Sequence, residues 1–269
     1  MTTQTPRINK TLLANRFGSR VDTYDEATPV QSEMAEALVR QVRSHFSSHE
    51  ELRILELGCG TGRMTCQLAA AFPEAEITAL DISVEMIQFA QTRCASVNYV
   101  VMDAEAFLRD AGDMYDLIIS NAVIQWFEDV DTALTKAYNM LAPKGLIMVS
   151  TFGDQTFNEL SQAFSYAYAM ASRPEAPHIV TMRTVDEWRR TLPDADVSQH
   201  FFIRSFPDVR QFLRSVQEAG AVNSMSGRYF LCRNVLREMN YYYTVHFSDL
   251  STGHVNATYH VVYIKCFGK

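Results

Sequence analysis

One short segment, Glu56-Leu-Gly-Cys-Gly-Thr-Gly62, constrains the fold of this chain more than any other feature. It follows an apolar run at residues 53–57 that is typical of a buried strand, and it precedes helical spacing at residues 63–71. Its three glycines let the backbone turn tightly and approach a ligand closely, because no Cβ intervenes. The spacing differs from the G-x-G-x-x-G of nicotinamide-binding loops, and the G-K-[ST] ending of a nucleoside-triphosphate loop is missing. We therefore predict a strand, a ligand-binding turn and a helix.

Strands and helices alternate through the first half of the chain. Further strands are expected at residues 76–80, 97–102, 115–120 and 145–150, and helices at 33–46, 85–94 and 131–141. After residue 152 we expect helices at 155–172, 183–192 and 209–219, and strands at 197–206 and 256–267. Alternating strands and helices form parallel sheets through right-handed crossovers. The predicted fold is α/β: a Rossmann-like seven-stranded sheet, last strand antiparallel, sandwiched by helices, with a helical insertion after strand five.

Polar side chains stand where consecutive strands end. Asp81 ends the second strand, and a carboxylate at this position can accept hydrogen bonds from both hydroxyls of a ribose. Asp103 ends the third strand, where it can accept from an exocyclic amine such as that of adenine. Asn121 ends the fourth strand. Open α/β sheets bind ligands at the carboxyl ends of their strands, so this ordered set predicts a nucleoside site.

This arrangement resembles that of the class I S-adenosylmethionine-dependent methyltransferases. The glycine segment is similar to the family's glycine loop, Ala79-Leu-Asp-Ile-Ser83 to its ribose-binding strand end, and Asp103-Ala-Glu105 to its adenine-side loop. The resemblance implies S-adenosylmethionine as the cofactor and S-adenosylhomocysteine as its product. The residues that it places around the cofactor are Phe17, Tyr24, Glu56, Gly58, Cys59, Gly60, Asp81, Ile82, Met86, Asp103, Ala104, Glu105 and Asn121.

Segments outside this core resemble the biotin-pathway malonyl-[acyl-carrier protein] O-methyltransferases. They include Asn15-Arg-Phe17, residues 24–31, Asn121-Ala-Val-Ile-Gln-Trp126, residues 150–160 and 217–223, and Ala257-Thr-Tyr-His-Val-Val262. This resemblance implies methyl transfer to the free carboxylate of a malonyl thioester on acyl carrier protein. Quinone-pathway and trans-aconitate methyltransferases share some of these pieces. The alternatives are therefore a methyltransferase for a free dicarboxylate or a quinol precursor, and a non-catalytic S-adenosylmethionine-binding protein.

The resemblance also suggests how the chain is divided. Residues 1–50 would form an N-terminal helical lid segment, and residues 51–152 the cofactor-binding core. Residues 153–195 would be the helical insertion that covers the acceptor site, and residues 196–269 the remainder of the sheet domain.

A carboxylate acceptor makes modest chemical demands. With a pKa near ~4 it is already ionised at neutral pH, so we expect no general base. It needs alignment and partial desolvation, and the bidentate fork of an arginine suits its orientation. The acceptor-site candidates are Tyr24, Gln125, Trp126, Phe152, Arg204, Arg210 and Arg214, with Arg16, Arg20, Arg173 and His178 as further candidates for holding the carboxylate.

Charge is unevenly distributed along the chain, whose formal net charge is -7. Residues 1–172 carry 12 basic and 22 acidic side chains, whereas residues 173–237 carry 10 arginines and 7 acids. This pattern argues against nucleic-acid binding and suits an acidic partner at the arginine-bearing segment. We predict that an acidic carrier protein docks there through Arg189, Arg190, Arg204, Arg210 or Arg214.

Other classes of protein are disfavoured by what the sequence does not contain. No apolar run approaches the roughly 20 residues that span a bilayer, so we expect no membrane association and a cytoplasmic location. The 5 cysteines form no C-x-x-C pair, and the 7 histidines show no H-E-x-x-H spacing, so we expect no metal. These patterns leave the oligomeric state open.

Overall fold

The structure is a computed structural model that describes residues 8–110, 112–176, 178, 180–219 and 232–269. Its seven strands form one sheet in the order β3-β2-β1-β4-β5-β7-β6. All neighbouring pairs are parallel except those made by β7, which runs antiparallel to both β5 and β6. The strands are β1 (Arg53–Leu57), β2 (Glu76–Asp81), β3 (Asn98–Val101), β4 (Tyr115–Asn121), β5 (Leu141–Phe152), β6 (Asp196–Phe206) and β7 (Val255–Phe267). This confirms the predicted sheet.

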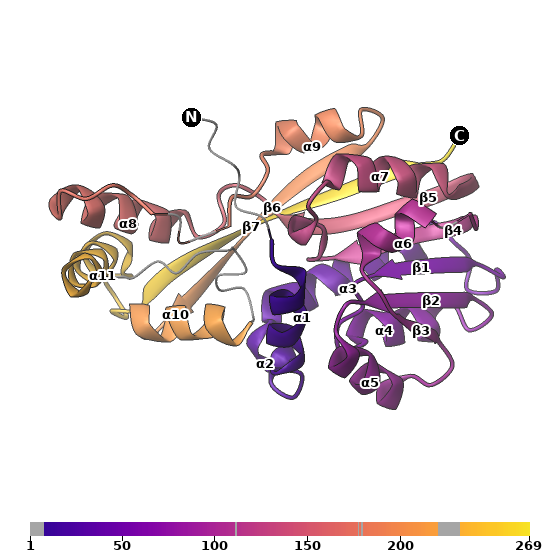
Figure 1. The fold of residues 1–269 in the computed structure, drawn as a ribbon, viewed down its shortest axis with the longest axis horizontal. Helices are drawn as coiled ribbons and strands as arrows, with labels where there is room; N and C mark the ends of the chain where they lie inside the picture. Colours follow the sequence, from indigo (N-terminus) through magenta and orange to yellow (C-terminus); the bar gives the residue numbers. More distant parts are fainter. Residues whose placement is uncertain (1–7, 111, 177, 179, 220–231) are drawn as a thin grey trace.

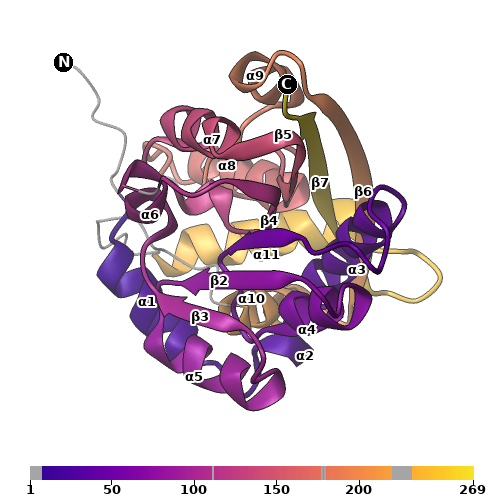
Figure 2. The same cartoon turned by 90° about the vertical axis from the view of Figure 1, so that its right-hand side faces the viewer.

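Helices cover both faces of the sheet, as Figure 2 shows. Alternate residues of each central strand point to opposite faces, so β1 buries Ile54 on one side and Leu55 on the other. The Ile54 face packs against α3 (Pro29–Arg43) and α4 (Arg63–Ala71). The Leu55 face packs against α6 (Ala104–Asp110), α7 (Val130–Asn139) and α9 (Val185–Thr191). A further helix, α5 (Val84–Arg93), follows β2.

Three helices form a separate cluster at one end of the molecule (Figure 1). They are α8 (Asn158–Met170), α10 (Val209–Glu218) and α11 (Arg233–Phe247), and they share an apolar core with the first residues of β7. Between this cluster and the sheet lie the short helices α1 (Lys10–Gly18) and α2 (Tyr24–Ala27) (Figure 1). The carboxyl ends of the parallel strands face the same way, so the space between sheet and cluster is where a ligand is expected.

Several local predictions were wrong in detail. The helix expected at residues 33–46 begins at Pro29, because proline at the first helical turn needs no N–H partner. The strand expected at 145–150 begins at Leu141 and runs through Pro143, with an irregular register against β4. Helices α6 and α11 were not predicted, and α1 and α2 were predicted only as part of a helical segment over residues 1–50. The predicted end of the 209–219 helix at Gly220 lies outside the described residues.

Among the described helices, none is both long and apolar enough to cross a membrane.

Candidate active site

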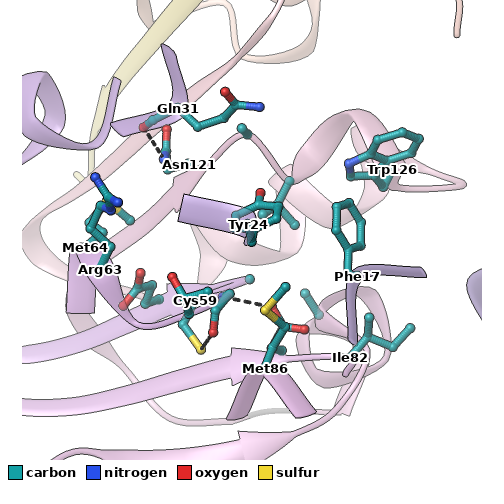
Figure 3. A pocket seen from close by; sticks show the side chains of 18 of the residues that line it. Phe17, Tyr24, Gln31, Cys59, Arg63, Met64, Ile82, Met86, Asn121 and Trp126 are labelled. Carbon is teal, nitrogen blue, oxygen red and sulfur yellow. Dashed lines mark hydrogen bonds between the residues drawn. The ribbon is translucent and has the colours of Figure 1, made fainter. Parts of the chain in front are cut away.

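A cavity lies at the carboxyl ends of β1, β2, β3 and β4, beneath α1 and α2 (Figure 3). We call it the first cavity. Its empty volume is about 1030 Å³ including the open mouth. Every residue that the resemblance placed around the cofactor lines this cavity except Glu105.

The glycine loop forms one wall of the first cavity, and Asp81 fixes its shape. The two carboxylate oxygens of Asp81 accept from the backbone N–H groups of Gly60 at 2.9 Å and Ser83 at 2.8 Å. Burial raises the pKa of Asp81, and these hydrogen bonds oppose that shift. The carboxylate is therefore held in place at the cavity wall, with lone pairs left to accept further hydrogen bonds.

Two glycines of the loop show why other residues would not serve. Gly58 has φ +76°, and a Cβ built there would lie 2.3 Å from Cγ2 of Val123. Gly60 has φ +54°, but a Cβ there would meet no protein atom within 4 Å. The first glycine is thus required by the protein's own packing. At Gly60 the absence of a side chain leaves the backbone exposed to the cavity, so that a bound cofactor can approach the backbone closely.

Glu56 is an unusual carboxyl group at the floor of the first cavity. Its exposed fraction is 1%, and neither carboxylate oxygen has a hydrogen-bond partner among the described residues. Burial raises the pKa of Glu56 to about 7; the side chain of Thr65 opposes this shift, and the nearby charge of Asp81 adds to it. A buried carboxylate without a hydrogen-bond partner destabilises the folded protein. The position of Glu56 therefore suits a ligand whose cationic group or N–H groups pair with this carboxylate.

The adenine-side loop is contacted by one residue that sequence reasoning missed, Lys10 of α1. Asp103 accepts from its own loop, at the N–H of Glu105 (3.0 Å), and from Nζ of Lys10 (2.6 Å). The Glu105 carboxylate accepts from Lys10 as well, and from the backbone N–H groups of Glu128 at 2.9 Å and Asp129 at 2.8 Å. Glu105 therefore supports the wall from behind. No sequence pattern pairs Lys10 with residues more than 90 positions away.

Helices α1 and α2 contribute side chains to the wall of the first cavity, and we call this pair of helices the lid because residues 1–50 are expected to form one. Phe17 makes edge contacts with Tyr24 and with Trp126, at centroid distances of 5.9 and 6.1 Å. Asp25 of α2 accepts from the hydroxyl of Thr61 at 2.6 Å and forms ion pairs with Arg63 and Arg93. Burial raises the pKa of the Tyr24 phenol, which therefore stays protonated. The lid is thus joined to the glycine loop and to α5.

A second cavity adjoins the first and extends towards the cluster of α8, α10 and α11. The two cavities share Phe17, Tyr24, Gln31, Ala122 and Trp126, which form their junction. The second cavity is lined mainly by apolar side chains, among them Phe152, Phe157, Leu160, Phe164, Leu213, Val216 and Leu236. Its geometry suits a ligand that reaches the junction through the helical cluster.

The acceptor candidates separate into two groups. Tyr24, Gln125, Trp126 and Phe152 line the second cavity. The Gln125 amide is fixed there, because its nitrogen donates to the carbonyl of Ala122 at 2.7 Å and its oxygen accepts from Thr151 at 2.9 Å.

The candidate arginines lie elsewhere, since no arginine or lysine is among the described lining residues of the second cavity. Arg204 forms an ion pair with Glu33 and lies over the ring of Phe202. Arg210 and Arg214 line an outer groove between α10 and α11. Arg16, Arg20 and Arg173 also do not belong to the described lining.

His178 does line the second cavity, but its ring is engaged. It stacks on Phe164 at a centroid distance of 4.0 Å, and its Nε2 lies 2.6 Å from the hydroxyl of Tyr168. Burial lowers the pKa of His178, so the ring is neutral near pH 7. Within the described part of the chain, no group of three or more His, Cys, Asp or Glu side chains is arranged to hold a metal ion.

Comparisons with known proteins agree with this geometry. Residues 48–199 match the family model of a methyltransferase domain. The chain is 38% identical to the malonyl-[acyl-carrier protein] O-methyltransferase of Anoxybacillus flavithermus, over 96% of this chain and 97% of that protein. It is 35% identical to the protein of the same name from Bacillus cytotoxicus, over 95% of this chain and 91% of that protein.

Solved structures show the same fold at low sequence identity. The YcgJ protein of Bacillus subtilis has a TM-score of 0.59 at 13% identity, covering 87% of this chain and 99% of its own. The magnesium protoporphyrin IX methyltransferase of Synechocystis PCC 6803, with bound SAH, has a TM-score of 0.56 at 13% identity. The match covers 95% of this chain and 98% of that protein. With full-length relatives of one name and a matching methyltransferase domain, the chain belongs to the malonyl-[acyl-carrier protein] O-methyltransferase family.

Proposed function

We propose that this protein transfers the methyl group of S-adenosylmethionine to the free carboxylate of a malonyl group carried by acyl carrier protein. The product is the malonyl methyl ester, the starting unit of biotin synthesis. The observation that carries the proposal is the junction between the two cavities: a nucleoside-type cavity lined by carboxyl groups meets a mainly apolar cavity at Tyr24, Gln31 and Trp126.

The residues of the first cavity fit the proposed cofactor. Asp81 offers carboxylate oxygens to the ribose hydroxyls, and Asp103 offers its carboxylate to the adenine amine. Glu56 offers a buried, unpartnered carboxyl group to the cofactor's ammonium group. When bound, the cofactor supplies an electrophilic methyl group on a sulfonium. The chain's own contribution is to hold that methyl group at the junction and to exclude water with α1 and α2.

The acceptor side fits a group that is already ionised. A malonyl carboxylate needs no proton removed, and His178, the one histidine among the described lining residues of the second cavity, already has its Nε2 engaged with the hydroxyl of Tyr168 at 2.6 Å. The protonated Tyr24 at the junction and Gln125 in the second cavity are neutral hydrogen-bond donors. We infer that these two, rather than an arginine, orient the carboxylate.

A direct assay tests this function against its alternatives. Labelled S-adenosylmethionine is incubated with malonyl-carrier protein, malonyl-coenzyme A, trans-aconitate and quinol precursors in parallel. The proposal expects the label in the malonyl thioesters, as an ester that alkali removes. Label in aconitate or in a quinol would assign the protein to the small-molecule alternatives. Cofactor binding without transfer to any acceptor would indicate a non-catalytic protein.

The methyl-transfer step is expected to be nearly independent of pH. At saturating cofactor and acceptor, the single-turnover rate should stay flat from about pH 6 to about pH 8.5, because the acceptor's pKa near ~4 lies well below this range. Rapid-quench measurements on enzyme shown to remain folded at each pH would check this. A steep rise across the range would mean that a phenol, amine or carbon acceptor loses a proton in the reaction.

We propose that the acyl carrier protein docks over α10 and α11. The outer groove that contains Arg210 and Arg214 shares Leu213, Gln217 and Leu236 with the second cavity. A carrier protein seated there would place its prosthetic arm at the entrance to that cavity. Arg189 and Arg190 belong to α9, which lies apart from α10 in both Figures 1 and 2. The arginines of the segment therefore do not form one surface.

Charge reversal distinguishes these positions. Arg210→Glu and Arg214→Glu should lower kcat/KM for malonyl-carrier protein about three- to tenfold, mainly through slower association. Malonyl-coenzyme A, which lacks the protein surface, should be affected less. Arg189→Glu and Arg190→Glu are matched controls that change the same charge on another face. If all four variants keep the wild-type ratio between the two substrates, the α10–α11 groove is not the docking surface.

The proposed location is the cytoplasm, because all five cysteines are free thiols, as is usual in a reducing compartment.

A further inference from the structure

We propose that Lys10 is a positioning residue of the first cavity: its ammonium group holds α1 closed over the bound cofactor by pairing with Asp103 and Glu105. The inference rests on the proposed cofactor. Lys10 lies outside the glycine loop and the strand-end carboxylates from which the cofactor site was predicted.

The contacts of Lys10 join three parts of the molecule. Its Nζ lies 2.6 Å from a carboxylate oxygen of Asp103 and also contacts Glu105. Glu105 in turn accepts from the backbone N–H groups of Glu128 and Asp129. Those residues follow directly after Trp126 and Phe127, which line the first cavity. Lys10 therefore connects the start of the lid to the adenine-side loop and, through Glu105, to the segment that carries the junction tryptophan.

Few apolar side chains of α1 are buried. Of the nine residues of α1, only Leu13 and Gly18 are buried. Phe17 adds an edge contact with Trp126. With so few buried apolar side chains, α1 gains little from the hydrophobic effect, so its polar contacts, the partly buried ion pairs of Lys10 among them, matter more for keeping it in place.

The surrounding charges make Lys10 hard to replace. The first cavity is lined by the carboxyl groups of Asp25, Glu56, Asp81 and Asp103, and among the described residues its only cations are Lys10 and Arg63. Arg63 is paired with Asp25. Without Lys10, Asp103 and Glu105 would face each other with no cation between them. Burial alone would lower the pKa of Lys10, but its hydrogen bonds to these two carboxylates outweigh burial and raise it. The ammonium group is therefore charged throughout the working pH range.

A latch of this kind should act on cofactor release. On this proposal the cofactor leaves when α1 moves, so losing the latch raises the dissociation rate while the association rate changes little. For Lys10→Met we expect S-adenosylhomocysteine to dissociate about tenfold faster, the consequence of losing hydrogen bonds between charged groups. Lys10→Arg keeps the charge and should restore a rate within about threefold of the wild type. Lys136→Met, which removes an exposed lysine of α7, is the matched control.

Stopped-flow fluorescence measures these rates, because Trp126 lies in the cavity wall against Phe17. Hydrogen exchange adds a second readout: the α1 amides should exchange faster in the Lys10→Met complex than in the wild-type complex. A double-mutant cycle with Asp103→Asn should show strong non-additivity in the dissociation rate. If Lys10→Met does not fold, Lys10→Gln takes its place in the cycle.

The outcomes separate this inference from the proposed function. If the wild-type protein does not bind S-adenosylhomocysteine, the proposed cofactor is wrong. If it binds, but neutral variants at position 10 keep the wild-type dissociation rate and the protection of α1, or if the cycle is additive, then Lys10 is not a latch.

Discussion

Replacing Asp81 by alanine is expected to weaken S-adenosylhomocysteine binding at least about a hundredfold while leaving the sheet folded. Each hydrogen bond to a charged group contributes roughly 1.5–3 kcal/mol, and the ribose would lose two of them. The variant also loses the acceptor for the N–H groups of Gly60 and Ser83, so the glycine loop is no longer held at the cavity wall. Titration calorimetry measures the affinity, and thermal unfolding shows whether the fold survives.

Two further variants make this result interpretable. Asp81→Asn keeps the size of the side chain and one acceptor oxygen, so its loss of affinity should be smaller than that of alanine. Asp194→Ala removes an exposed carboxylate that does not line the first cavity, and this variant should bind S-adenosylhomocysteine as tightly as the wild type. An unchanged dissociation constant for Asp81→Ala would remove Asp81 from the site.

The parts of the site that could be predicted from the sequence are those that depend on local order. In a parallel sheet each strand ends at the same edge, so a glycine loop after one strand and carboxylates after the next two must converge. Asp81 and the glycine loop do so through the 2.9 Å hydrogen bond from the backbone N–H of Gly60 to the Asp81 carboxylate. The positions of the glycine loop and of the strand-end carboxylates can therefore be predicted without knowing which side chains of distant segments are in contact.

What could not be predicted depends on contacts between distant segments. Lys10 reaches Glu105 across 95 positions, and Arg204 meets Glu33 across 171. The sequence shows that residues 173–237 are rich in arginine, but it does not show where each side chain lies. The structure places the five arginines proposed for docking (Arg189, Arg190, Arg204, Arg210 and Arg214) on α9, β6 and α10, and the described lining of the second cavity is mainly aromatic and aliphatic.

The second cavity therefore changes how recognition of the acceptor is explained. An arginine clamp would bind a carboxylate whether or not the cofactor is present. A site with neutral donors such as Gln125 and Tyr24 orients the carboxylate but supplies no net positive charge. We accordingly expect the acceptor carboxylate to bind well only when a cationic cofactor occupies the first cavity.

Replacing Glu56 by glutamine is expected to stabilise the unliganded protein at pH 8 and to weaken cofactor binding. Burial raises the pKa of Glu56 to about 7, whereas the unfolded chain has the ordinary value of 4.5. A raised pKa in the folded state means that the free energy of unfolding falls as the pH rises from 4.5 through about 7. The loss is ~3 kcal/mol at most. Glutamine keeps the shape without the charge, so thermal unfolding of the variant should lack this decline.

Cofactor binding should show the opposite dependence on pH. If the cofactor's ammonium group pairs with the Glu56 carboxylate, the bound state favours the ionised form and lowers its pKa. The affinity of the wild type for S-adenosylhomocysteine should then rise from about pH 6 to about pH 8, with release of a proton on binding. In Glu56→Gln the affinity at pH 8 should be lower by about tenfold or more and independent of pH.

Both measurements are needed, because each excludes a different explanation. A variant that is more stable but binds as tightly as the wild type, with the same pH slope, would mean that Glu56 is a strained group without a role in binding. A variant that binds weakly and is also less stable at pH 8 would mean that the carboxylate supports the glycine loop. If the Glu56 carboxylate serves to bind the cofactor, the variant should be more stable and should bind the cofactor more weakly, with no dependence on pH. The buried carboxylate then destabilises the unliganded protein, and only the bound cofactor offsets this destabilisation.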